Sequence, residues 1–89
     1  YIMDEKIQKV LEEKIQESIS KKNEIALLAK SLGTENENAF IRGIIIGRLY
    51  NSFYYQSRRI LNRSPTDQEF SEFVKLLKEH ENKLSSSFS

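Results

Sequence analysis

The residues best suited to chemistry are arginines and tyrosines in the middle of the chain. Between positions 38 and 64 every charged side chain is an arginine, and tyrosines and a phenylalanine lie among them. Guanidinium groups bind phosphates and aromatic rings stack on bases, so this pattern is typical of a nucleic-acid contact. If the stretch is helical, four of the arginines fall within an arc of about 120°. The candidate anion or nucleic-acid contacts are Arg42, Arg48, Tyr55, Arg59 and Arg63.

The same arginines have an internal use, which we favour. Glutamates occur in the segments on either side of the arginine-rich stretch, and guanidinium groups pair well with carboxylates. A tyrosine, with one polar end, suits a half-buried position between helices. The candidate partners are Glu12, Glu13 and Glu17 on the N-terminal side and Glu69, Glu72 and Glu79 on the C-terminal side.

Motifs for catalysis or metal binding are weak. His80 is the only histidine and has no second ligand at helical spacing, and the chain contains no cysteine. No glycine-rich phosphate loop occurs, and nothing places a serine on a strained turn as a nucleophile. We therefore expect no metal, no cofactor and no enzymatic activity.

The segments that carry these residues are predicted to be helices. The 89 residues include only three glycines and one proline, they are rich in Glu, Lys, Leu and Ile, and they show no strict alternation of apolar and polar residues. The sequence predicts a small all-α domain of three or four helices around one long central helix. We assign residues 1–84 to a single helical domain and residues 85–89 to a flexible C-terminal tail.

The N-terminal part predicts one or two helices. From about position 4 to 20 an apolar residue recurs every four positions, beginning at Met3. A polar stretch at 20–23 suggests a break, with Ser20 or Asn23 as the N-cap of a second segment that ends near Gly33. A single helix over residues 4–32 is the alternative, because apolar positions continue across the polar stretch.

The central helix is predicted over residues 35–62, with Thr34 and Glu37 as a capping box. About 28 residues make a rod of about 42 Å, whereas a compact domain of this size has a radius of gyration near 12 Å. We expect such a helix to protrude, to pair with another chain, or to kink near Gly43–Gly47. A fourth helix follows, and it begins either at a capping box of Thr66 and Glu69 or at Ser64 with Pro65 in the first helical position. Its predicted buried face is Phe70, Phe73, Val74, Leu77 and Leu84.

One face of the central helix carries a small residue at every fourth position, which allows another backbone to approach closely. That neighbour is either a helix of the same chain or the same helix of a second copy. The stretch 40–50 is also apolar nearly all round, and such a helix is usually covered on every side. The predicted helix-crossing or self-association face consists of Ala39, Ile41, Gly43, Ile44, Ile45 and Gly47.

Composition and charge limit the possible locations and functions of the protein. The net charge of +1 gives no strong overall attraction to nucleic acid or to acidic membranes, and the longest apolar run is far too short to cross a bilayer. We therefore expect no membrane association and a cytoplasmic location. The favoured function is a non-catalytic helical interaction module, acting as a homodimer, a homo-oligomer or with a protein partner. The alternative is a nucleic-acid-binding protein that uses the arginine and tyrosine face.

Overall fold

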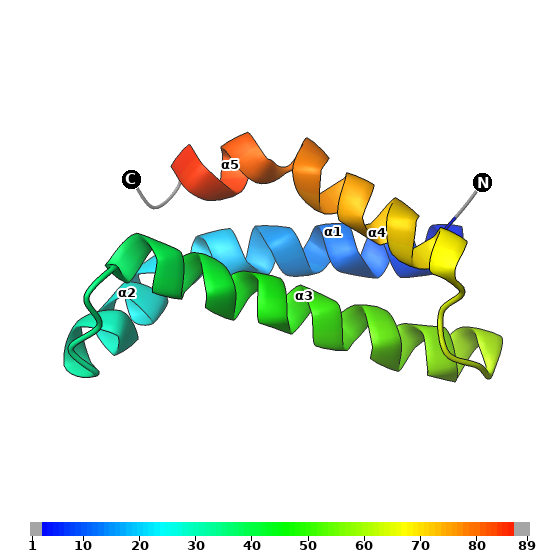
Figure 1. The fold of residues 1–89 in the computed structure, drawn as a ribbon, viewed down its shortest axis with the longest axis horizontal. Coiled ribbons are helices and arrows are strands. Elements are labelled where there is room, and N and C mark those ends of the chain that lie inside the picture. The colour runs from blue at the N-terminus through cyan, green and yellow to red at the C-terminus, as the bar shows by residue number, and fades with distance from the viewer. Residues whose placement is uncertain (1–2, 87–89) are drawn as a thin grey trace.

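The computed structural model describes residues 3–86, and everything described is helix or short connection. The helices are α1 (Glu5–Ser20), α2 (Lys22–Ser31), α3 (Glu37–Leu61), α4 (Asp67–Glu79) and α5 (Glu81–Ser86). Figure 1 shows α1 and α3 side by side, with α4 and α5 running along the upper side. The prediction of a small all-α fold around one long helix is confirmed. Of the tail expected at 85–89, the first two residues belong to α5 and the rest lie outside the described residues.

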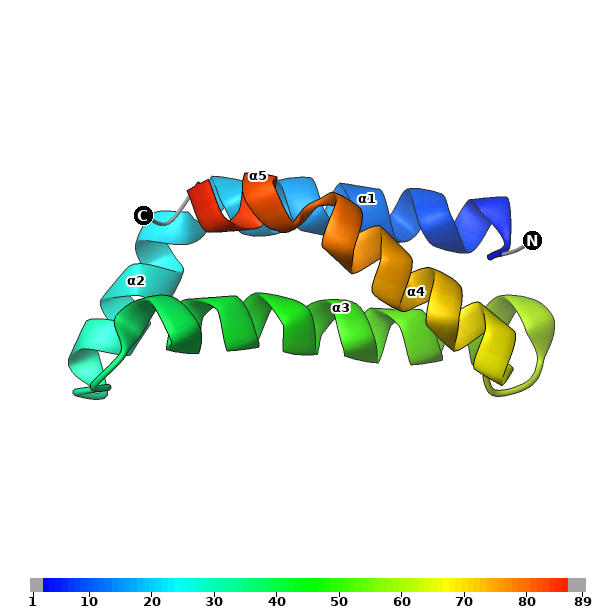
Figure 2. The same cartoon turned by 45° about the horizontal axis from the view of Figure 1, so that its top comes forward.

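The N-terminal part forms two helices rather than one. Asp4 caps α1 by accepting hydrogen bonds from the backbone N–H groups of Lys6 and Ile7. The break falls at Lys21, as the polar stretch predicted, but neither expected residue caps α2. Lys21 itself stands at the N-cap and gives no side-chain hydrogen bond, while Asn23 lies within the helix. The bend turns α2 toward the N-terminal end of α3 (Figure 2).

Helix α3 is continuous from Glu37 to Leu61, with no break at its two glycines. The N-cap is Asn36, whose side chain accepts from the backbone N–H of Ala39, and not Thr34 as expected. The hydroxyl of Thr34 instead donates to the carbonyl of Ala29 at the end of α2. The left-handed residue Asn62 ends the helix.

The long helix does not protrude, because the whole molecule is long. At 1.5 Å per residue α3 measures about 37 Å, and the molecule extends 39 × 22 × 21 Å. Its radius of gyration is 13.8 Å, larger than the compact value we assumed. Helices α1, α4 and α5 run along α3 and share its length (Figures 1 and 2).

Helix α4 begins with the predicted capping box between Thr66 and Glu69. Of its expected buried face, Val74 and Leu77 are half-buried, and Leu84 of α5 is buried as predicted. Phe73 and Leu76 are buried, whereas Phe70 is 38% exposed. The rings of Phe73 and Phe53 of α3 stack with centroids 4.5 Å apart. This contact between two buried aromatics fixes α4 against α3.

The core is a set of aliphatic and aromatic side chains from all the helices. The four-residue spacing of α1 places one buried row against α3, and α3 supplies a matching row. The fully buried members of the two rows are Ile7, Leu11, Ile15, Ile45, Leu49 and Phe53. Ala29 of α2 and Leu84 of α5 belong to the same core.

The glycines of α3 do not lie at a crossing within the chain. A Cβ atom built on Gly43 or on Gly47 would meet nothing within 4 Å. The intrachain explanation for the small residues is therefore wrong for residues 3–86, since no helix in that range comes close to that backbone. Within one copy, both glycines only weaken the helix.

This open environment generates a prediction. Replacement of Gly43 or Gly47 by alanine should raise the free energy of unfolding by roughly 0.5–1 kcal/mol for each substitution, because alanine restricts the unfolded chain and clashes with nothing. Urea unfolding of dilute protein, followed by circular dichroism, measures the change. A decrease in stability would mean that another backbone of the same chain packs against these positions.

Candidate interaction surfaces

The predicted arginine surface is divided among three ion pairs. Arg42 binds Glu81 of α5 at 2.5 Å, Arg48 binds Glu17 of α1, and Arg63 binds Glu69 of α4. Arg42 and Arg48 thus point to neighbours on different sides of α3. The internal use of the arginines is confirmed for these residues, and the structure does not bring Arg42 together with the other candidates.

Two of the three acidic partners were among those expected from the sequence. Glu17 and Glu69 were predicted as partners, and Glu81 was missed because it follows the end of α4. Its pairing with Arg42 depends on how α5 folds back over the N-terminal half of α3 (Figure 1). Glu17 has a pKa below its ordinary value, first because Arg48 donates a hydrogen bond to it and then because Lys14 lies nearby.

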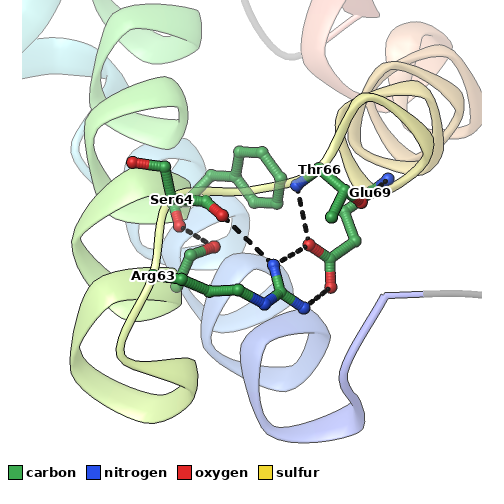
Figure 3. Close-up of polar contacts among 6 residues, drawn as sticks. Arg63, Ser64, Thr66 and Glu69 are labelled. Atoms are coloured by element: carbon green, nitrogen blue, oxygen red, sulfur yellow. Dashed lines mark hydrogen bonds and ion pairs between the residues drawn. The ribbon is translucent and has the colours of Figure 1, made fainter.

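The pair between Arg63 and Glu69 closes the turn from α3 to α4 (Figure 3). The guanidinium donates to both carboxylate oxygens, at 2.6 and 3.0 Å, and also to the carbonyl of Ser64 at 3.1 Å. The backbone N–H of Thr66 donates to the same carboxylate at 2.9 Å. These bonds hold the pKa of Glu69 at about 2, with the Arg63 bond as the largest cause. Arg63 is therefore a structural residue of this turn.

Arg58 and Arg59 have no carboxylate within ion-pair distance among the described residues. The guanidinium of Arg58 lies 5.7 Å from the ring centre of Tyr54, a cation–π contact. Arg59 donates to the side-chain oxygen of Gln56 at 3.3 Å. Their charges are thus the least neutralised in the central helix.

A shallow hollow of about 360 Å³ lies between α1 and α3. Its lining contains cationic and neutral polar side chains and no carboxylate, and Tyr55 at its edge is 61% exposed. Arg48 and Tyr55 are the only predicted nucleic-acid contacts that line it. The lining residues are Lys14, Arg48, Asn51, Ser52, Tyr55 and Gln56.

The outward side of α3 forms a second surface, which we call the outer face. It consists of Ala39, Gly43, Gly47 and Tyr50, which lie away from the buried row on a helical wheel. Tyr54 borders this face and is half-buried against the core, and Asn51 borders it on the side of the hollow beside α1. No side chain of this set is charged, and a Cβ atom on either glycine would have open space around it. Tyr50 is 47% exposed, and its ring centre lies 5.0 Å from that of Tyr54.

The isoleucines that we assigned to the self-association face lie elsewhere. Ile41 and Ile45 are 3% and 0% exposed, because they belong to the row that packs against α1. Ile44 is half-buried beside the same core. Their enclosure comes from the chain itself, so Ile41 and Ile45 are core residues and not part of a contact surface. Ala39, Gly43 and Gly47 remain at the surface.

Helix α2 and its C-cap Leu32 expose three leucines. Leu27, Leu28 and Leu32 are 65%, 45% and 62% exposed. Ile25 and Ala29 make the buried side of α2, and a two-sided apolar pattern in a ten-residue helix does not reveal which side is inward.

Other chemistry has little support in the described structure. His80 lies with Nδ1 3.0 Å from the carbonyl oxygen of Leu76. Within residues 3–86, no group of three or more acidic, histidine or cysteine side chains is arranged to hold a metal ion. In the same range, no helix has the length and apolar character needed to cross a bilayer. Comparisons with models of protein families, with curated proteins and with solved structures find no match to this chain.

The Arg63–Glu69 pair predicts a specific acid sensitivity. The carboxyl has an ordinary pKa of 4.5 and a folded-state pKa of about 2, so the pair stabilises the fold above pH 4.5 and this contribution disappears as the pH falls toward 2. Glu69→Gln should remove that part of the pH dependence, and Arg63→Gln should remove most of it. Urea unfolding at several pH values measures both. An unchanged acid response in both variants would mean that the pair does not form in solution.

Proposed function

We propose that this protein is a non-catalytic helical module for protein–protein interaction, and that its contact surface is the outer face of α3. The observation that supports this most directly is the lack of charge on that face. Ala39, Gly43, Gly47 and Tyr50 carry no charge, and the next charged residue on this side of the helix is Arg58, one turn beyond Tyr54. Interface centres are poor in charged residues and rich in aromatic ones, and tyrosine is a frequent energetic anchor.

Helix α1 provides an internal comparison. Its outward positions include Lys9, Glu12, Glu13 and Gln16, all exposed, which is the usual composition of a helix face in water. The outer face of α3 belongs to the same small fold and meets the same solvent, yet it carries none of these residue types. Its two glycines lower the stability of the helix, and no neighbour in the chain benefits from their small size.

Site-specific photocross-linking tests the proposal. Benzoylphenylalanine is placed at Tyr50 on the outer face, or at Gln16 on the exposed face of α1 as the control, in the cells that make the protein. We expect a covalent adduct with a protein from position 50 and none from position 16. Gly43→Leu on the same face should abolish the adduct by blocking close approach. Equal adducts at both positions, or an adduct insensitive to Gly43→Leu, would contradict the proposal.

A second candidate function is binding of single-stranded nucleic acid at the hollow between α1 and α3. The observation that favours it is the lining of Lys14, Arg48 and neutral polar groups around the exposed ring of Tyr55, without any carboxylate. Phosphates would contact the cations, and a base would stack on the tyrosine. The pairing of Arg48 with Glu17 reduces the available charge, which is why we rank this function second.

Fluorescence anisotropy with a labelled single-stranded oligonucleotide tests this second candidate. Lys14→Gln and Tyr55→Ala should each weaken binding, by roughly tenfold for the loss of base stacking, whereas Arg42→Gln on the other side of α3 should not. Binding should also weaken as salt is raised, since phosphate contacts release counterions. No binding at low salt, where such contacts are strongest, would eliminate this function.

A further inference from the structure

We infer that Lys14, Lys21 and Arg48 form a phosphate-binding subsite beside the hollow between α1 and α3, and that the carboxylate of Glu17 competes with phosphate for it. This inference deepens the second candidate function, on which its choice of ligand rests. Three observations support it, namely the excess of positive charge around Glu17, the incomplete pairing of Arg48 and the composition of the hollow.

Positive charges of α1 and α3 converge on Glu17. Lys14, Glu17 and Lys21 are three and four residues apart, so they share one side of α1. The pKa of Glu17 lies below its ordinary value, first because Arg48 donates a hydrogen bond to the carboxylate and then because of the positive charges of Lys14 and Lys21. Neither lysine has a carboxylate within ion-pair distance among residues 3–86. Three cations thus surround a single carboxylate, and the surplus of positive charge favours a further anion.

The pair between Arg48 and Glu17 uses only part of the guanidinium. One nitrogen of Arg48 donates to one oxygen of Glu17, whereas Arg63 donates to both oxygens of Glu69. The side chains of Arg48 and Glu17 are 33% and 43% exposed, and ion pairs in contact with water are weak. A phosphate group offers more acceptor oxygens than Glu17 gives here, so it can take the place of the carboxylate at Arg48.

The hollow provides room for the rest of a nucleotide. Arg48 and Tyr55 lie seven residues apart on α3, which is two helical turns, and both line the hollow. Between them Asn51 and Ser52 offer neutral groups that can donate hydrogen bonds. A phosphate held at Arg48 and Lys14 would leave the exposed ring of Tyr55 for a base to stack on. Since Glu17 must release Arg48 first, the chain as it stands binds such a ligand less tightly than its cations would allow.

Two matched substitutions test the competition. Glu17→Gln and Glu81→Gln each remove one negative charge and free one arginine, Arg48 beside the hollow and Arg42 at α5. In fluorescence anisotropy with a labelled oligothymidylate, Glu17→Gln should tighten binding by roughly two- to fivefold at low salt. It should also steepen the slope of log affinity against log salt by about 0.7, the value of one added phosphate contact on a single strand. Glu81→Gln should change neither quantity, and equal gains from both variants would overturn the competition.

Titration with inorganic phosphate separates this inference from the second candidate function. In nitrogen-15 NMR spectra, phosphate should shift the signals of the subsite residues and not those of Arg42. Half-saturation should require less phosphate in Glu17→Gln than in the wild-type chain. Shifts with phosphate but no binding of the oligonucleotide would support the subsite and eliminate nucleic acid as its ligand. No shift at the subsite in either chain would overturn the inference, even if an oligonucleotide binds through Tyr55.

Discussion

The packing of the buried apolar row of α1 against that of α3, which we call the α1–α3 seam, determines how the other helices are oriented. Each helix contributes a row of apolar side chains spaced about four residues apart, and the members that meet in the middle are fully buried. Because an α-helix has 3.6 residues per turn, fixing that row inward also fixes which residues point outward. Once Ile45 and Leu49 face α1, Gly43 and Gly47 must lie away from the core, and Tyr54 lies at its edge, half-buried. The exposed surface of α3 is thus a direct consequence of the core.

The arginines of α3 act around the same seam as positioning groups for the neighbouring helices. Arg48 reaches Glu17 of α1, Arg42 reaches Glu81 of α5, and the turn before α4 is closed by a bidentate pair. Pairs of this kind at a surface contribute little to stability individually. Their value lies in geometry, since each guanidinium accepts a carboxylate in only a few orientations. This use leaves Arg58 and Arg59 as the charges that remain available to a partner.

The outer face carries two features that are unfavourable in an isolated chain. Glycines weaken a helix that must remain continuous over 25 residues, and the exposed Tyr50 places apolar surface in water. Both features become favourable when another helix covers the face, because the glycines then allow close contact and Tyr50 is buried. The fold is stabilised by the seam on the other side of α3, so this face is free to vary without loss of the core.

The sequence by itself determined the helical class, the four-residue row of α1, the presence of one long central helix and the capping box at Thr66. These depend on spacing and on contacts within one turn, which are local properties of the chain. The sequence also indicated that the arginines would meet glutamates of α1 and α4. It left open whether residues 4–32 form one helix or two and whether the central helix kinks at its glycines.

Only the tertiary structure decided which apolar residues are inward. Ile41 and Ile45 are buried while Leu28 and Leu32 are exposed, although all four occur in apolar stretches. It likewise decided that Glu81 pairs with Arg42 and that the glycines face open space. The physical reason is that a helix with apolar residues on several sides can bury any of them, and the choice depends on where the other helices pack.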